Sequence, residues 1–213
     1  MGIKVAVDLR HRFGPIRHQR KRPTCMAFAA SDAHSFARGV PDALSAEYAF
    51  YHAVRRKPVP DRTKGVSYAV MTETLAVDGQ PWEEGWPYLE KLEPTDPWTP
   101  PTSPGTIYRR TAKTIGKTVD DLVKTLDSGS AVLVVMEIST SFFELKADLV
   151  LPPLLGEKRR GVHAMVVVGH GDHNGERCLL LRNSWGDKWA NEGYGWVHEK
   201  YLAPRLIAAG VMN

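Results

Sequence analysis

The stretch Gln19-Arg-Lys-Arg-Pro-Thr-Cys25-Met-Ala-Phe-Ala decides the fold, because it places one cysteine at the expected start of a helix. Thr24 is a residue type that caps helices, so the helix is predicted to begin at Cys25. Two stretches far downstream belong to the same pattern, Gly161-Val-His163-Ala and Arg182-Asn183-Ser-Trp185-Gly186. Together they supply a thiol nucleophile, an imidazole base and an amide that can orient the imidazole, a set suited to acyl transfer.

The composition is that of an ordinary globular protein, with 213 residues, 43% of them apolar and 24% charged. No apolar run approaches the roughly 18 residues needed to cross a bilayer. Asp8 and Arg10 interrupt the N-terminal segment where a signal peptide would need its apolar region. A cytoplasmic enzyme without membrane contact is therefore the default expectation. A mature form, or a domain cut from a secreted or longer protein, would have the same features.

The chain has two cysteines, Cys25 and Cys178, which are too few for a disulfide scaffold. Cys178 opens an apolar run that is typical of a strand, so we expect it to be a buried, unreactive thiol. The fold must then be held together by packing alone.

Positive charge is concentrated in the segment Arg17 to Arg22, directly before the nucleophile. This segment has no interleaved aromatic residues and no recognised nucleic-acid motif, so nucleic-acid binding is not expected. One interpretation is a solvated loop surface. The other is a site for an acidic partner, or for acidic residues of a substrate.

Hydrophobic periodicity predicts helices in the first part of the chain and strands in the second. Between them, residues 80–105 are rich in Trp and Pro and are expected to cross irregularly between two lobes. Helices followed by strands indicate an α+β class. The predicted helices cover residues 25 to about 39, 45–56, 67–77 and 118–126, and the predicted strands cover 3–8, 131–138, 163–169, 178–183 and 194–198.

Each polar side chain of the motifs has an expected role. A helix N-terminus and a facing imidazolium would both lower the pKa of Cys25, giving a thiolate paired with His163. The side-chain oxygen of Asn183 would accept a hydrogen bond from the imidazole, and Trp185 would cover that bond from water. Gln19 and the Cys25 N–H would hold the oxyanion of the tetrahedral intermediate. Taken singly, these are also compatible with a buried thiol, a core histidine, a turn asparagine and a surface glutamine; their combination favours catalysis.

The order of the motifs resembles the papain (C1) family of cysteine peptidases, and its compact bacterial members more than its secreted, disulfide-bonded ones. The resemblance extends over nearly the whole chain. The matching motifs are Gln19 with Cys25-Met-Ala-Phe-Ala, Leu44-Ser45, Gly65-Val66-Ser67, Trp86-Pro87-Tyr88, Gly161-Val-His163-Ala, Asn183-Ser-Trp-Gly and Gly193-Tyr194-Gly195.

This resemblance implies a papain-like two-lobe fold with the active-site cleft between the lobes. The left lobe, residues 10–110, would be helical and carry the nucleophile. The right lobe, residues 1–9 and 111–213, would be β-barrel-like and carry the imidazole and the amide. The resemblance also implies a protein or peptide substrate that binds extended in the cleft, and no cofactor.

The resemblance assigns substrate contacts as well. The backbones of Gly65 and Val66 are expected to hydrogen-bond the substrate. Ser67 and Ala164 are expected to border the pocket that usually dominates specificity in this family.

Some positions depart from the family pattern. Arg20 and Pro23 stand in the oxyanion loop where glycines are usual, Met26 follows the nucleophile where Trp is common, and Ala190 replaces a usual Gly. None of these changes removes a reacting group, but each can reshape the cleft. The segment Leu149 to Arg160 is expected to be either a flap beside the cleft or a plain surface loop.

The stretch His170-Gly-Asp172-His173 contains metal-binding residue types but lacks further ligands at a recognisable spacing. Because Asp-His-Asn-Gly is typical of a turn between two strands, no metal site is predicted.

The sequence therefore predicts a cysteine peptidase that hydrolyses peptide bonds through an acyl-enzyme. One alternative passes the same acyl group to an amine, as a peptide ligase, cyclase or acyltransferase would. The other is a non-catalytic binding module or effector that uses the cleft only to hold a partner.

Overall fold

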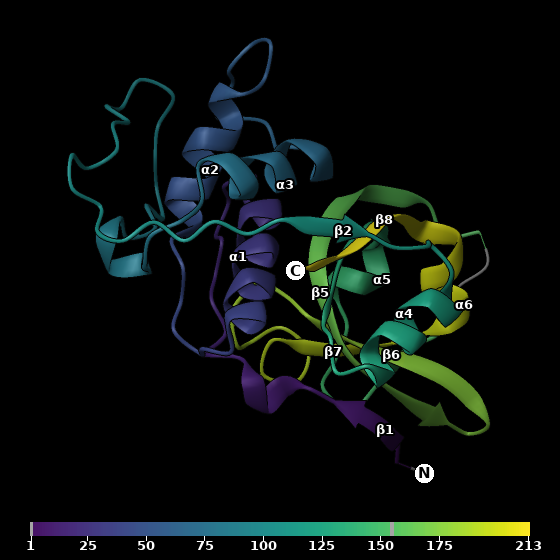
Figure 1. Ribbon diagram of the computed structural model, residues 1–213. Helices are drawn as coiled ribbons and strands as arrows, with labels where there is room; N and C mark the ends of the chain where they lie inside the picture. Colours follow the sequence, from purple (N-terminus) through teal and green to yellow (C-terminus); the bar gives the residue numbers. More distant parts are fainter. Residues whose placement is uncertain (1, 154–155) are drawn as a thin grey trace.

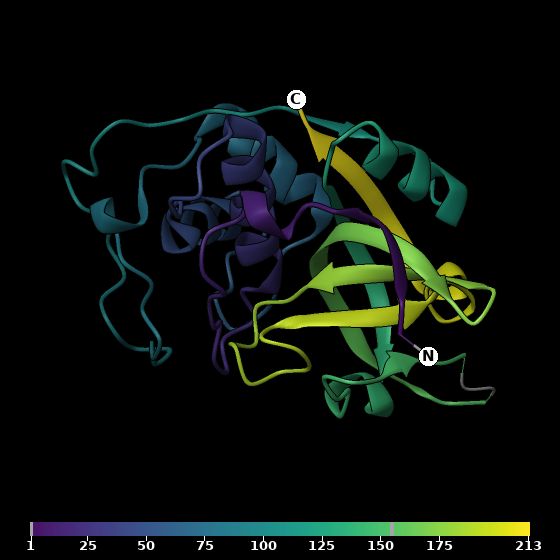
Figure 2. The same cartoon turned by 90° about the horizontal axis from the view of Figure 1, so that it is seen from below.

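The computed structural model describes residues 2–153 and 156–213 and separates the helices from the sheet (Figure 1). Three helices from the first part of the chain gather on one side. Among the described residues, eight strands form one curved sheet on the other side, and the separation persists in the turned view (Figure 2). The predicted α+β class is confirmed.

Helix α1 (Cys25–Arg38) lies at the centre of the helical side and is buried along most of its length. It begins at Cys25, as predicted, but the side chain of Thr24 makes no capping hydrogen bond and instead contacts the hydroxyl of Tyr88 at 2.8 Å. The C-cap is Gly39, whose φ of 71° favours glycine. Helices α2 (Ala46–Arg55) and α3 (Tyr68–Val77) pack against it. The hydroxyl of Ser45 caps α2 by accepting a backbone N–H. This packing fixes the N-terminus of α1, and the cysteine on it, against the sheet.

The sheet has a long central strand, β5, against which α1 packs. Its order is β2-β8-β3-β5-β6-β7-β4, and β1 also pairs with β5. The strands are β1 (Lys4–Asp8), β2 (Ala112–Thr114), β3 (Val132–Ser139), β4 (Val150–Leu151), β5 (Arg159–His173), β6 (Glu176–Arg182), β7 (Tyr194–His198) and β8 (Leu206–Met212).

The sheet is open, which corrects the expectation of a β-barrel-like lobe. The edge strands β2 and β4 do not pair with each other within the described part of the chain. Both are short, with three and two residues, so neither offers a ladder long enough to close the sheet. The curvature seen in Figure 2 still wraps the sheet around its own core.

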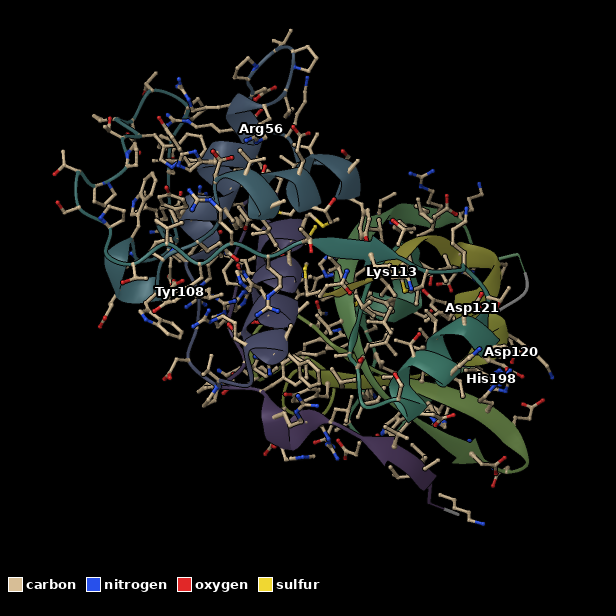
Figure 3. The ribbon with its side chains drawn as sticks, in the orientation of Figure 1. Arg56, Tyr108, Lys113, Asp120, Asp121 and His198 are labelled. Carbon is tan, nitrogen blue, oxygen red and sulfur yellow. The ribbon has the colours of Figure 1, made fainter. Side chains whose placement is uncertain are left out.

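Shorter helices cover the ends of the sheet. Helix α4 (Val119–Asp127) begins with a capping box between Thr118 and Asp121, the latter labelled in Figure 3. The remaining short elements are α5 (Thr140–Phe143), α6 (Glu199–Leu202) and the 3-10 turns Arg10–Arg12, Glu83–Gly85 and Ala203–Arg205.

The irregular crossing expected for residues 80–105 is present. Apart from one 3-10 turn it contains no regular element, and it runs around the helices before entering β2 (Figure 1). Within residues 2–153 and 156–213, no helix is both long enough and apolar enough to span a bilayer.

One buried charge cluster ties the N-terminal segment to both sides of the molecule. Asp32 on α1 accepts hydrogen bonds from Arg17 Nη2 and from Arg182 Nε, each at 2.7 Å. Arg182, at the end of β6, also donates to the carbonyls of Gly14 at 3.0 Å and Pro15 at 2.7 Å. The segment that leads to Gln19 is thereby fixed between helix and sheet.

Candidate active site

The thiol of Cys25 lies at the N-terminus of α1, facing β5. Its residue is half-buried. Burial raises the pKa of Cys25, whereas hydrogen bonds from the backbone N–H groups of Ala164, Met26 and Cys25 itself act to lower it. The contact with Ala164 matters most for the geometry, because this residue directly follows His163 on β5.

The imidazole of His163 is oriented by Asn183. The distance from His163 Nε2 to Asn183 Oδ1 is 2.7 Å, and the same oxygen accepts the backbone N–H of Ser184 at 2.8 Å. Trp185 lies over the imidazole, with ring centroids 4.6 Å apart. Both His163 and Asn183 are buried. With Nε2 engaged, Nδ1 is the ring nitrogen left to exchange a proton with a thiol.

Burial opposes the expected thiolate–imidazolium pair in the unliganded site. Burial lowers the pKa of His163 to about 4, and the hydrogen bond to Asn183 only partly opposes this. Burial also raises the pKa of Cys25, so desolvation favours the neutral form of each group. When a proton moves from the thiol to the imidazole, the N–H groups around the sulfur stabilise the thiolate. The oxygen of Asn183 stabilises the imidazolium.

This burial predicts a loss of stability in acid. His163 and the core residue His34 both have a pKa lowered by burial from 6.5 to about 4. Between these values the unfolded chain binds protons that the folded chain does not, so the free energy of unfolding should fall as pH decreases. We expect a loss of about 2 kcal/mol per histidine between pH 7.5 and pH 5.

Urea unfolding at several pH values measures this loss, and His34→Gln supplies the control. That variant should lose the His34 contribution of about 2 kcal/mol to the pH dependence. An unchanged slope in the variant would contradict a depressed pKa at His34.

Gln19 is held by the segment that follows Asn183. Its backbone N–H donates to Ser184 O at 2.8 Å, and Ser184 Oγ donates to Gln19 Oε1 at 2.8 Å. Its Nε2 donates one hydrogen to Arg22 O at 2.9 Å, leaving the second for an oxyanion. Gln19 is buried rather than a surface residue. Ser184 was missed by the sequence reasoning, although it lies within the Asn-Ser-Trp motif.

We expect Gln19→Ala and Ser184→Ala to impair hydrolysis by different amounts. Loss of the oxyanion donor Gln19 should lower kcat by about 100- to 1000-fold. Loss of the Ser184 hydroxyl removes one hydrogen bond that orients this donor, so kcat/KM should fall by about 2- to 10-fold. Alkylation of Cys25 by iodoacetamide forms no oxyanion and should change little in either variant. A parallel loss of alkylation would indicate a general disturbance of the site instead.

The loop between Gln19 and Cys25 has an unusual backbone. Arg20 has a φ of 55°, and its N–H donates to His18 Nδ1 at 2.9 Å. A residue with a side chain pays about 1–2 kcal/mol of conformational energy in this left-handed region, whereas glycine does not. Ala190 also stands where the family usually has glycine, and its φ of 47° lies in the same left-handed region.

The basic segment is not one solvated surface. Arg17 is paired with Asp32, and Arg22 forms a buried, bidentate pair with Glu47, whose carboxylate lies 2.5 and 2.8 Å from the guanidinium nitrogens. Their positive charges are therefore compensated internally. Arg20 and Lys21 are the exposed cations of this segment.

The residues expected to bind substrate lie on two elements. Gly65, Val66 and Ser67 form the extended stretch before α3, and Gly65 and Ser67 are exposed. The Ser67 hydroxyl caps α3 by accepting a backbone N–H at 3.3 Å. Gly65 faces the carbonyl of Pro23 in the oxyanion loop. Ala164 is buried on β5, with its N–H directed to the thiol.

Two other sequence expectations concern β5 and β6. The turn Asn174-Gly175 joins these strands, as predicted, and His170 Nε2 lies 2.8 Å from Asp127 Oδ1. No group of three metal-binding side chains occurs in the described part of the chain. Cys178 is fully buried on β6, as predicted, and burial raises its pKa to about 11, which disfavours the reactive thiolate.

The segment Leu149 to Arg160 contains β4, which pairs in parallel with β7 at the edge of the sheet. Its residues 154 and 155 lie outside the described residues. The choice between a flap and a surface loop therefore stays a prediction.

Comparison with known proteins identifies the family. The family model described as papain family cysteine protease matches residues 68–206, more than half of the chain. A cysteine protease of Blomia tropicalis is 26% identical over 196 residues, covering 87% of this chain and 58% of that protein. This chain thus spans less than two thirds of that relative.

Solved structures agree in fold. Xylellain, a cysteine protease from Xylella fastidiosa, superposes with a TM-score of 0.80 and 22% identity, covering 100% of this chain and 87% of the other. Procathepsin L 3 of Tenebrio molitor gives a TM-score of 0.77 and 17% identity, covering 100% and 70%. The predicted papain-like fold is confirmed, and this chain belongs to the papain family of cysteine proteases.

Proposed function

We propose that this protein is a cysteine peptidase in which Cys25, His163 and Asn183 form the reacting set. The 2.7 Å contact between His163 Nε2 and Asn183 carries the proposal, because it orients the imidazole and leaves Nδ1 to exchange a proton. His163 directly precedes Ala164, whose N–H contacts the thiol. We infer that the substrate cleft lies between a helical lobe, residues 10–110, and a sheet lobe, residues 1–9 and 111–213.

The first half of the reaction forms an acyl-enzyme. Cys25 Sγ attacks the substrate carbonyl carbon while its proton passes to His163 Nδ1. The oxyanion accepts hydrogen bonds from Gln19 Nε2 and the Cys25 N–H. His163 then gives the proton to the leaving nitrogen, the C–N bond breaks, and an amine departs from a thioester on Cys25.

The second half regenerates the enzyme. His163 takes a proton from water, whose oxygen attacks the thioester carbonyl, and the proton returns to the sulfur as the C–S bond breaks. In both halves the proton moves only while bonds form or break, so the thiol and the imidazole can both be neutral before the reaction, as burial favours. Substrate hydrolysis should therefore not require a pH above the raised pKa of the thiol.

The test is cleavage of a peptide library followed by mass spectrometry of the products. Hydrolysis should give two free termini, and a stoichiometric thioester of Cys25 should be trapped with an activated ester substrate. Addition of an amine nucleophile separates peptidase from ligase. If most products carry the added amine even when this amine is dilute, the protein is an acyltransferase or ligase and not a peptidase. An absence of both cleavage and thioester would overturn the proposal.

A further inference from the structure

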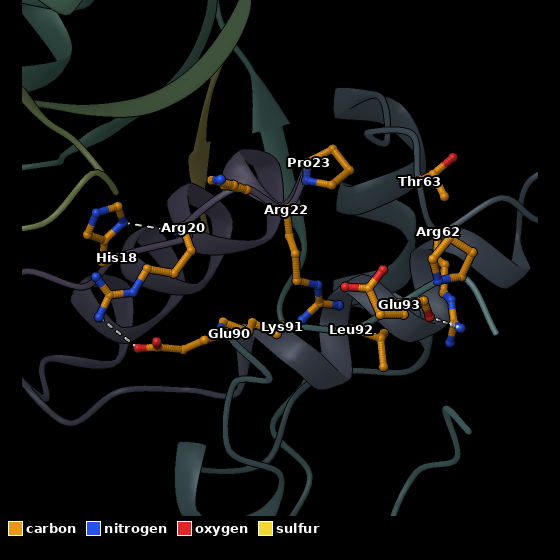
Figure 4. A pocket seen from close by; sticks show the side chains of 12 residues that line it. His18, Arg20, Arg22, Pro23, Arg62, Thr63, Glu90, Lys91, Leu92 and Glu93 are labelled. Carbon is orange, nitrogen blue, oxygen red and sulfur yellow. Dashed lines mark hydrogen bonds and ion pairs between the residues drawn. The ribbon is translucent and has the colours of Figure 1, made fainter. Parts of the chain in front are cut away.

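A large cavity lies beside the proposed oxyanion site. Its volume is about 950 Å³, and it is lined by His18 and by residues 20–23, 62–63 and 90–94 (Figure 4). Gln19, the expected oxyanion donor, sits between His18 and Arg20, which both line this cavity. A substrate carbonyl held by Gln19 would therefore place its neighbouring side chains at the mouth of the cavity.

The wall of the cavity carries a net positive charge. Five positive side chains and two carboxylates line it; these are Arg20, Lys21, Arg22, Arg62 and Lys91, against Glu90 and Glu93. Arg22 is compensated by Glu47 from behind. Lys21 and Lys91 take part in no ion pair within residues 2–153 and 156–213. An excess of positive charge in a hollow surface favours an anionic ligand.

Arg20 is held in the cavity wall against its backbone preference. Its positive φ favours glycine, and strained residues of this kind are concentrated at functional sites. Its guanidinium lies 2.9 Å from Glu90, and the two side chains are 47% and 58% exposed (Figure 4). Such an exposed pair is weak, so an incoming carboxylate can share or replace the contact.

The position of the cavity indicates which part of a substrate it meets. Residues 62–63 lead directly into Gly65 and Val66, the stretch expected to bind the substrate backbone, and Gly65 faces Pro23 across the loop. These elements all belong to the helical side, which carries the nucleophile. The peptide on the acyl side, which stays attached to Cys25, would run along this wall.

We propose that the cavity binds an aspartate or glutamate side chain on the acyl side of the scissile bond, so that the enzyme prefers acidic substrates. This proposal rests on the proposed peptidase function. The lining contains no Phe, Tyr or Trp on which a nucleotide base could stack, which favours an acidic peptide over a nucleic acid.

The experiment compares peptides that differ only by Glu, Gln or Lys at each of the first three acyl-side positions. At low salt, kcat/KM should be about tenfold higher for Glu than for Gln at one of them, and the ratio should shrink at high salt because the contact is electrostatic. In R20Q/K21Q the Glu-to-Gln ratio should fall at least fivefold. In E90Q, which removes the competing carboxylate, it should rise.

K117Q/K124Q is the matched control, because it also removes two exposed positive charges, neither of which lines the cavity, and it should leave the ratio unchanged. Equal hydrolysis of Glu and Gln peptides at all three positions would overturn the proposal. A preference that survives in R20Q/K21Q would do the same.

Binding to Cys25→Ala distinguishes this failure from failure of the proposed function. Fluorescence anisotropy should show tighter binding of the Glu peptide than of the Gln peptide, by a similar ratio, without any turnover. If the Glu peptide binds selectively but the wild type hydrolyses no peptide, the proposed peptidase function is refuted and the acidic specificity of the cavity is supported. Hydrolysis without selective binding would refute the cavity and support the peptidase.

Discussion

Replacing Cys25 with alanine is expected to lower kcat/KM for peptide hydrolysis by about a million-fold. The reason is that the thiol forms the covalent bond, and no other nucleophile lies on α1 at this position. His163→Ala should cause a loss of similar size. Because the two residues act as a unit, the double variant should fall no further than either single variant. Steady-state kinetics on one good peptide substrate measures all three.

Cys178→Ala is the matched control for the nucleophile. Its thiol is fully buried on β6 with a pKa of about 11, so the variant should keep its activity and still contain one reactive thiol. Peptide hydrolysis by Cys25→Ala at more than a few per cent of the wild-type rate would contradict the assignment. Unchanged biological activity in Cys25→Ala would instead favour the non-catalytic binding module.

Asp32→Asn is expected to lower the free energy of unfolding by about 3–5 kcal/mol. Burial raises the pKa of Asp32, but Arg182 and Arg17 more than offset this and hold it below its usual value. The carboxylate is therefore charged, and its removal leaves Arg182 without a carboxylate partner in a buried site, while Arg17 keeps only the longer 3.4 Å contact with Glu83. Urea unfolding at pH 7 measures the loss.

The control for Asp32 is an ion pair at the surface. Glu73 is 61% exposed and lies 3.0 Å from Arg56, so Glu73→Gln should change the free energy of unfolding by no more than about 1 kcal/mol. If Asp32→Asn destabilises the protein no more than this control does, the buried cluster does not hold the N-terminal segment in place. A change in the dependence of the unfolding free energy on urea concentration would indicate that Asp32→Asn alters the compactness of the denatured or the native state.

Local signals explain why much of the fold could be predicted. Thr24 and Ser45 precede apolar helical patterns, and α1 and α2 begin where these residues indicate. The apolar runs of β3 and β6 likewise marked buried strands. Strand β8 was missed because Leu206–Met212 contains small residues and a glycine, and its partners β3 and β2 lie far away in sequence.

The candidate residues of the site could be selected from the sequence, but their burial could not. The sequence pairs His163 with Asn183 through a motif, whereas burial, which decides the pKa values, depends on how the two sides of the molecule meet. For the same reason the sequence was compatible with a solvent-exposed Arg22, whereas in the structure this residue is paired with the buried Glu47. The role of Ser184 was hidden because its partner Gln19 is distant in the chain.

The activation of Cys25 by His163 is measured by the rate at which iodoacetamide alkylates Cys25 from pH 5 to pH 9, beside glutathione as a free thiol. At pH 6–7 Cys25 is expected to react faster than glutathione although burial favours its neutral thiol, because His163 takes the proton while the sulfur attacks. This advantage should disappear in His163→Ala. A rate no higher than that of glutathione, and unaffected by His163→Ala, would contradict the account.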